Sequence, residues 1–324
     1  MGETTAIEWT ATYHADGTKT PGRTWNPWQG CKKVSPGCKF CYMYRDKTRY
    51  GQDPMTVVRS SPATFNAPLK WREPAKVFTC SWSDWFIDEA DGWRDEAWDI
   101  VRRTPRLTYQ ILTKRPERIL DHLPADWGNG WPNVWLGTSA ENQQYADERI
   151  PHLLRVPAVV RFLSAEPLLG PVNLTKVGPE RWDVLHGWKP ANENYPEGAN
   201  TSRVDWVIVG GESGPGARPM HPDWARNLRD QCQAAGVPFF FKQNGEWVPA
   251  EHPVMKREPI LSYYDSDYKR GIFDGNGTWK FHEGTYSKYE NILGQVMYRV
   301  GKKAAGRLLD GVEWNEMPRL KEAA

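Results

Sequence analysis

The stretch DWVIVGGE, residues 205–212, shows the pattern that decides the fold. It places a short apolar run directly before two glycines and an acid, without alternation of polar and apolar residues. Such a run is typical of a strand that is buried on both faces, as in a parallel sheet covered by helices. Five more runs have the same character: AKVFTCSW (75–82), RLTYQILT (106–113), NVWLGTS (133–139), AVVRFLSAE (158–166) and VPFFFKQ (237–243).

Helix-compatible segments separate several of these runs. The clearest are DEAWDIVRRT (95–104), AENQQYADERIPHLLRV (140–156) and HPDWARNLRDQCQAAG (221–236), and Gly236 at the end of the last one is a typical helix stop. Repeated strand–helix–strand units join parallel strands by right-handed crossovers. With a short strand around residues 23–27, the pattern predicts an α/β fold, a full or partial (β/α) TIM-like barrel. A doubly wound open sheet is the alternative.

The barrel core is expected over residues 20–247, followed by a C-terminal α+β extension over residues 248–324. The extension reads as loops and short antiparallel strands with a DGNG turn at 274–277, and its last part resembles a short helix with its cap. Residues 175–203 are rich in Gly, Pro and Asn, and they predict a lid or a variable surface loop inserted before the strand at 205–212.

Composition limits the class of protein. The chain has 324 residues, of which 39% are hydrophobic and 25% charged, as in globular proteins, and its net charge of +2 does not by itself demand a nucleic-acid partner. Most of the eighteen tryptophans are expected to pack in the core, while a minority are candidates for stacking on bases. We find neither a signal-type N-terminus nor an apolar run that would span a membrane, so a cytoplasmic protein is expected.

Polar residues follow nearly every predicted strand. Because parallel strands end at the same edge of a sheet, these side chains are expected to meet there and to form a site. They are Ser83, Asp84, Lys114, Arg115, Ser139, Glu141, Ser164, Glu166, Glu212, Ser213, Lys242 and Gln243.

The segment GCKKVSPGCKFCYMYR (30–45) holds Cys31, Cys38 and Cys41 in the spacing C-x6-C-x2-C. Five cysteines in the whole chain, three of them clustered, disfavour a disulfide framework and favour a reducing compartment. A structural zinc site would need a fourth ligand, such as His14 or Cys80. Unpaired packing thiols do not suit so polar a loop. The remaining interpretation is a 4Fe–4S cluster held by three thiolates, with one iron left open for a small molecule.

The cysteine motif, with Phe40 directly before its last cysteine, resembles the signature of radical S-adenosylmethionine (radical SAM) enzymes. The usual spacing there is C-x3-C-x2-C, and the first gap is longer in this chain. The closer resemblance is to a phage- and prophage-associated three-Cys-motif family of uncharacterised function, itself regarded as radical-SAM-like. It extends over roughly residues 24 to 315 and rests on WNPWQGCKKVSPGCKFCY, LSAEPLLGP, DWVIVGGESGPGARPM, FFFKQNGEW and GKKAAGRLLDG.

This resemblance implies an enzyme with a 4Fe–4S cluster on Cys31, Cys38 and Cys41 that reductively cleaves S-adenosyl-L-methionine to a 5′-deoxyadenosyl radical. An external electron donor is implied, and a nucleobase or nucleic acid and a partner protein are candidates for substrate and partner. The expected cofactor-binding residues are Phe40, Ser83, Asp84, Ser139, Glu141, Glu166, Gly210, Gly211 and Glu212. The candidates for catalysis are Lys114, Glu166 and Lys242.

Two other functions remain open from the residues alone. One is a zinc-stabilised nucleic-acid-binding phage protein without redox chemistry. The other is a metal-dependent hydrolase or nuclease on a β/α barrel, with Asp84, Glu141, Glu166 and Glu212 as metal ligands. Asp84 also has a purely structural interpretation, as the cap of a following helix. Cys232 is expected to be a packing residue, and Cys80 is expected near the site without a catalytic role.

Overall fold

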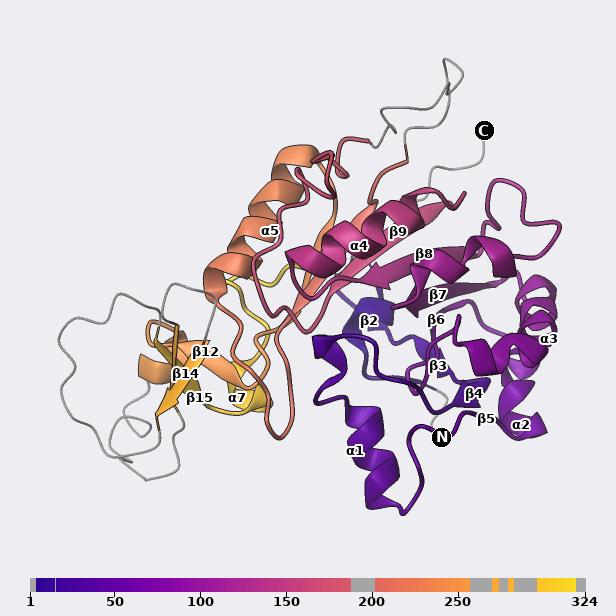
Figure 1. Ribbon diagram of the computed structural model, residues 1–324, viewed down its shortest axis with the longest axis horizontal. Coiled ribbons are helices and arrows are strands. Elements are labelled where there is room, and N and C mark those ends of the chain that lie inside the picture. Colours follow the sequence, from indigo (N-terminus) through magenta and orange to yellow (C-terminus); the bar gives the residue numbers. More distant parts are fainter. Residues whose placement is uncertain are drawn as a thin grey trace.

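The computed structural model describes residues 4–14, 16–187, 202–256, 270–273, 279–282 and 296–318. The fold is mixed α/β, with a seven-stranded parallel sheet that curls into a half-barrel (Figure 1). Its strands are β3 (Arg23–Trp25), β6 (Ala75–Thr79), β7 (Leu107–Thr113), β8 (Val134–Ser139), β9 (Val160–Ala165), β10 (Trp206–Gly210) and β11 (Phe239–Gln243). Each of the six predicted apolar runs therefore contains a strand, and the short strand near residue 23 is also present.

The strand order is β11-β10-β9-β8-β7-β6-β3, which follows the chain from one edge of the sheet to the other. A doubly wound sheet reverses direction at a switch point, so the sequential order excludes that alternative. Within the described residues the edge strands β3 and β11 do not pair with each other, so the described sheet is an open half-barrel rather than a closed barrel.

Helices cover the outer face of the sheet. They are α3 (Asp91–Arg103), α4 (Gln143–Leu154) and α5 (Pro222–Ala235), which follow β6, β8 and β10. The first begins four residues before the predicted segment, and Gly236 ends the last in the left-handed conformation, with φ of 63°. Two crossovers lack an α-helix among the described residues: β7 leads to β8 through the 3-10 turns η5 (Pro116–Arg118) and η6 (Leu120–His122), and the described parts of the connection from β9 to β10, residues 166–187 and 202–205, hold no helix.

The opposite face of the sheet is filled by segments from both ends of the described chain. The 3-10 turn η1 (Glu8–Thr10) places Trp9 against Phe78, with ring centroids 4.6 Å apart, and against Trp206 at 6.3 Å. The indole N–H of Trp206 donates to the carbonyl oxygen of Glu316 at 2.9 Å. Trp9 and Trp206 are almost completely buried, so these end segments complete an aromatic core that the open sheet alone would expose.

The remaining elements are short. Near the N-terminus and around the cysteine motif they are β1 (Thr12–Tyr13), β2 (Lys19–Thr20), β4 (Trp28–Gln29), η2 (Pro36–Cys38), α1 (Tyr42–Arg49), β5 (Val58–Arg59), α2 (Pro62–Phe65), η3 (Ala67–Lys70) and η4 (Asp88–Ala90). The predicted extension contains η7 (Pro253–Lys256), α7 (Lys302–Ala305) and a four-stranded antiparallel sheet of β12 (Trp247–Pro249), β13 (Arg270–Phe273), β14 (Trp279–His282) and β15 (Val296–Arg299).

Two expectations fall largely outside the described residues: the DGNG turn at 274–277 and residues 188–201 of the predicted insertion. None of the described helices combines the length and the apolar content that crossing a bilayer requires.

Candidate functional site

The cysteine loop, residues 30–41, lies over the carboxyl ends of the parallel strands. Its first residue is tied to the segment after β6, because the amide of Gly30 donates to the carbonyl of Trp82 at 3.0 Å and the hydroxyl of Ser83 donates to the carbonyl of Gly30 at 2.5 Å. Its last residue, Cys41, directly precedes α1. The loop is therefore held between one strand end of the half-barrel and one helix.

All five cysteines of the chain are free thiols, and the three in the loop are partly exposed. Burial raises the pKa of the Cys31 thiol to about 12, with the Asp84 carboxylate adding to the shift and Arg115 opposing it. Burial also raises the pKa of Cys41, and Cys38 acts electrostatically on both Cys31 and Cys41. Cys38 therefore lies within electrostatic range of both other cysteines of the loop.

Glu141 anchors the centre of the cysteine loop. Its side chain is fully buried; Oε1 accepts from Ser35 Oγ and from Lys114 Nζ, both at 2.6 Å, and Oε2 accepts from Arg149 Nη1 at 3.0 Å. Although burial opposes ionisation, Lys114 and Arg149 hold the pKa of Glu141 below its usual value. A Cβ added to Gly37 would lie only 2.4 Å from Oε1, so the loop backbone rests directly on this carboxylate.

Asp84 joins the ends of β6 and β7. Its Oδ1 accepts from Thr113 Oγ1 at 2.6 Å and from the Phe86 amide at 3.0 Å, and its Oδ2 accepts from the Lys114 amide at 2.8 Å. Arg115 Nη1 lies 3.2 Å from the same Oδ2 and reaches the loop, because Arg115 Nη2 donates to the Lys32 carbonyl at 3.1 Å. Asp84 is therefore occupied by protein donors, in a strand-joining role rather than as the cap of a longer helix.

Arg218 anchors the far side of the cysteine loop. Its guanidinium binds Glu212 through Nε at 2.7 Å and Nη2 at 2.6 Å, and Nη2 also donates to the Pro36 carbonyl at 3.0 Å. The same group lies 5.3 Å from the ring centroid of Phe40. A Cβ on Gly216 would lie 2.8 Å from that ring, so the glycine-rich segment after β10 packs closely against the loop.

Glu166, at the end of β9, is the most accessible carboxylate among the predicted site residues at the strand ends. Its side chain is 19% exposed and pairs with Lys242 Nζ at 2.7 Å, while Gln243 Nε2 donates to Oε1 at 3.3 Å. Tyr42 lies within electrostatic range of it, because Cys41 and Glu166 add to the rise that desolvation causes in the pKa of this phenol. The Tyr42 hydroxyl donates to the Ser81 carbonyl. A carboxylate, an ammonium and a phenol thus border the cysteine loop on this side.

The structure brings the predicted strand-end residues together, but it gives several of them structural partners. Ser139 is buried in β8, and its carbonyl accepts from Arg149 at 2.9 Å. Gly210 and Gly211 face protein rather than open space, since added Cβ atoms would lie 3.2 Å from Glu166 Oε1 and 2.1 Å from the Asn244 carbonyl oxygen. Three further residues lie at the site that were not predicted from the sequence: Ser35, Arg149 and Tyr42. Of these, only Ser35 and Tyr42 could have been found from the sequence, because they lie in or next to the cysteine motif.

Cys80, at the end of β6, lies close enough to Cys31 for the two thiols to interact electrostatically, and burial raises the pKa of Cys80. Cys80 therefore lies near Cys31 of the cysteine loop. Cys232 is buried in α5, as expected for a packing residue. Over the described ranges, no three His, Cys, Asp or Glu side chains are close enough to share one metal ion.

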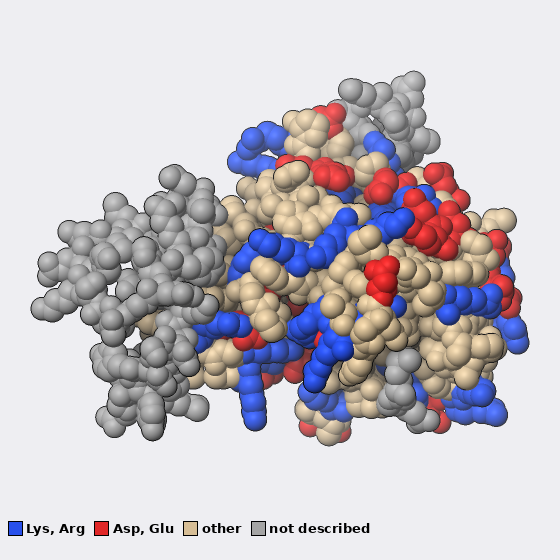
Figure 2. Space-filling view, turned by 60° about the horizontal axis from the view of Figure 1, so that its bottom comes forward, with Lys and Arg blue, Asp and Glu red and all other residues tan. Residues whose placement is uncertain are grey.

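Basic side chains surround the cysteine loop. Lys33 and Lys39 are exposed, and their ammonium groups lie over the rings of Tyr44 and Phe40, at 4.5 and 5.2 Å from the centroids. Figure 2, which brings the lower side of Figure 1 forward, shows Lys and Arg side chains gathered across the middle of that face. The surface at the cysteine loop therefore offers positive charge next to aromatic rings.

Comparison with known proteins gives one family. A family model with the description "Protein of unknown function (DUF5131)" matches residues 4–318. No curated protein and no solved structure matches the chain.

Proposed function

The chain belongs to the DUF5131 family of proteins of unknown function, and we propose that it is an iron–sulfur enzyme of the radical SAM type. One observation carries the proposal: three free thiols of a single loop are held over the carboxyl edge of a curled parallel sheet, where β/α-barrel enzymes build their sites. The resemblance of the motif to those of phage-associated three-Cys proteins and radical SAM enzymes supports it. A thiol-based site also suits a reducing compartment such as the cytoplasm.

The residues present fit a 4Fe–4S cluster. The donor set consists of three thiols, and thiolates are the ligands that hold such clusters. In a cubane each thiolate binds a different iron, so the ligands need not converge on one ion. Arg115 lies within hydrogen-bonding reach of Cys31 and offsets negative charge there. When bound, the cluster supplies the electron that cleaves the C–S bond of S-adenosylmethionine.

The chain's own residues divide into two groups in this proposal. Asp84, Glu141 and Glu212 accept from protein donors at nearly every oxygen, so we assign them to positioning the cysteine loop. Glu166 is partly exposed beside Tyr42, and we assign its carboxylate to the ammonium group of the methionine moiety. Lys242 then orients Glu166 through their ion pair at 2.7 Å.

Anaerobic purification tests the class of enzyme. We expect brown protein with about four irons per chain and release of 5′-deoxyadenosine when dithionite and S-adenosylmethionine are added. Cys38→Ala is expected to lose iron and product together. Cys232→Ala is the matched control, because this thiol lies in α5 outside the loop. Equal product release by Cys38→Ala and the wild type would end the proposal.

Glu166→Gln tests the assignment of the ammonium site. The variant keeps the size and hydrogen bonding of the side chain but removes its charge, so we expect iron content to be retained. The KM for S-adenosylmethionine is expected to rise about tenfold or more, the usual effect of losing a charged hydrogen bond. An unchanged KM with full iron content would mean that the ammonium group binds at a residue other than Glu166.

A zinc site is the second candidate: Cys80 lies within electrostatic range of Cys31, and zinc would require the four thiols to move onto one ion. Colourless protein with one zinc per chain, lost in Cys80→Ala, would establish it. The hydrolase alternative is disfavoured, because three of the four carboxylates that it would use as metal ligands are buried and already pair with a cation, which leaves only the partly exposed Glu166. These pairs are Asp84–Arg115, Glu141–Lys114 and Glu212–Arg218.

The substrate that we propose is anionic, with a nucleic acid as the candidate. Lys33 and Lys39, each above an aromatic ring, give the combination of charge and stacking surface that nucleic-acid sites use. Binding of a fluorescent oligonucleotide is then expected to weaken as salt is raised and to weaken further in a Lys33→Ala/Lys39→Ala variant. Binding that is insensitive to both changes would exclude a nucleic acid at this surface.

A further inference from the structure

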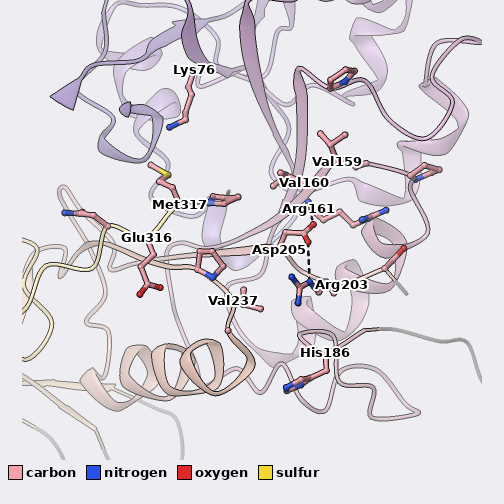
Figure 3. Close-up of a pocket in the computed structure, with 18 of the residues that line it drawn as sticks. Lys76, Val159, Val160, Arg161, His186, Arg203, Asp205, Val237, Glu316 and Met317 are labelled. Carbon is pink, nitrogen blue, oxygen red and sulfur yellow. Dashed lines mark hydrogen bonds and ion pairs between the residues drawn. The ribbon is translucent and has the colours of Figure 1, made fainter. Parts of the chain in front are cut away.

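A cavity lies at the opposite edge of the sheet from the cysteine loop, where the parallel strands begin. Its volume is about 1480 Å³, and its walls come from β1, the starts of β6, β9 and β11, and the segment around Met317 (Figure 3). Lys76 projects into it on one side, while Asp205 lies across it with Arg161 and Arg203 (Figure 3). The proposed function makes no use of this cavity.

The Lys76 ammonium group lines the cavity without a paired carboxylate among the described residues. Its ammonium donates to the Ala11 carbonyl at 2.9 Å and lies 6.0 Å from the ring centroid of Trp135. A lysine ammonium has three N–H donors, so two remain for other acceptors. Burial lowers the pKa of Lys76 to about 8, which leaves the group mostly charged at neutral pH. No carboxylate among the described residues pairs with it.

Several other buried or half-buried cations in the described structure pair with an acid. Arg94 pairs with Asp91 at 2.7 Å, Arg149 with Glu141 at 3.0 Å, and Lys242 with Glu166 at 2.7 Å. Burying a charge without a partner is costly, and pairing lowers that cost. Lys76, which is half-buried, has no acidic partner among the described residues and lies at the wall of a cavity, where a bound anion would supply one.

On the wall opposite Lys76, acidic side chains offset the basic ones. Asp205 Oδ2 accepts from the Arg161 amide at 2.8 Å, and Oδ1 lies 3.6 Å from Arg203 Nε. Glu316, also on the wall, is occupied because its Oε2 accepts from the Phe239 amide at 2.8 Å. The charged lining residues are Lys76, Arg161 and Arg203 against Asp205 and Glu316, so the lining has more cationic than anionic side chains.

We propose that this cavity is a second binding site, for a small molecule that carries a carboxylate or phosphate group, and that Lys76 donates to that oxyanion. The cavity is larger than most small-molecule sites, so the ligand has room to extend from Lys76 towards Asp205 and Arg203. The proposal does not depend on the function of the cysteine loop.

Chemical labelling of the full-length wild type tests the site. Pyridoxal 5′-phosphate joins an aldehyde to a phosphate: the amine adds to the aldehyde carbon, water leaves, and borohydride reduces the resulting C=N bond. Peptide mapping is expected to show Lys76 modified at least several-fold faster than the exposed Lys70 and Lys303. Orthophosphate or succinate is expected to protect Lys76 several-fold compared with chloride at equal ionic strength, and the more protective anion identifies the ligand's group.

Variants give the second measurement. The midpoint temperature of thermal unfolding of the wild type is expected to rise with the concentration of the protecting anion until it reaches a plateau. Lys76→Arg is expected to keep this response. Lys76→Met is expected to need at least about tenfold more anion for the same rise. Slow labelling of Lys76 together with no protection beyond that of chloride would overturn the proposal. So would an equal thermal response of wild type and Lys76→Met. If Lys76→Met fails to fold, the labelling of the wild type decides.

Discussion

Replacing Gly37 by alanine tests whether the cysteine loop is seated on Glu141 without changing any charge or thiol. The added Cβ would lie 2.4 Å from Oε1, 2.6 Å from Cγ and 2.8 Å from Cδ of Glu141, whereas ordinary contact begins at 3.4 Å. Glu141 cannot retreat freely, because it is fully buried and accepts from Ser35, Lys114 and Arg149. The loop must therefore move by roughly 1 Å. Gly37 has no left-handed φ, so backbone strain does not contribute.

The cost can be worked from these contacts. If the loop stays in place, overpacking of this kind costs about 1–3 kcal/mol. If the loop moves instead, separating Ser35 from the Glu141 carboxylate costs about 1–3 kcal/mol as well. If the seated loop is the form that holds the cluster, iron retention after anaerobic reconstitution is expected to weaken about tenfold to hundredfold. The assay is iron per chain at a series of chelator concentrations, with thermal unfolding of the metal-free protein measured in parallel.

Gly92→Ala is the matched control, because nothing lies within 4 Å of a Cβ at this position in α3. It is expected to retain iron and to gain up to about 1 kcal/mol from helix propensity. Iron retention by Gly37→Ala equal to that of the wild type would refute the seating of the loop on Glu141.

Three other results are expected. Arg149→Met removes one of the two cations from the buried Glu141, so the free energy of unfolding should fall by about 3–5 kcal/mol in urea titrations, and a loss below about 1 kcal/mol would contradict the buried pair. Trp9→Ala should cost about 3–5 kcal/mol in the same assay, because the indole is 3% exposed, and a near-neutral effect would mean that the N-terminal segment is not part of the core. Lys76 has a folded pKa of about 8, below the unfolded value of about 10.4, so between these values the unfolded chain binds the proton and stability rises with pH. From pH 7.5 to 9.5 the wild type should gain about 2 kcal/mol relative to Lys76→Met, and parallel pH profiles of the two proteins would contradict the depressed pKa.

The strands of the half-barrel were predictable because burial on both faces requires nearly continuous apolar runs, and those runs stand out in the sequence. The meeting of their polar ends at one edge followed from the parallel arrangement. Whether the sheet closes into a barrel could not be predicted, because nothing in the sequence indicates whether the edge strands β3 and β11 pair. The role of η1 was also hidden, since one buried tryptophan in a polar segment shows no periodicity.

The roles of the site carboxylates were less predictable. Asp84 and Glu141 had the right residue type at the right strand ends, yet each is occupied by protein donors. Their partners are fixed by tertiary structure: Arg115 reaches Asp84 from the next strand, and Arg149 reaches Glu141 from α4. A sequence shows which groups arrive at an edge, but the packing of helices and loops decides which of them remain available to a ligand.

The aromatic core behind the sheet has a consequence for how the protein is made. The indole N–H of Trp206 finds its acceptor on Glu316, and Trp9 packs against Trp206. A chain emerging from the ribosome cannot complete this core until residues near 316 have been synthesised, although Trp9 is present from the start. Partly made chains therefore expose a broad aromatic surface, and we expect them to depend on chaperones until the segment around Glu316 has been synthesised.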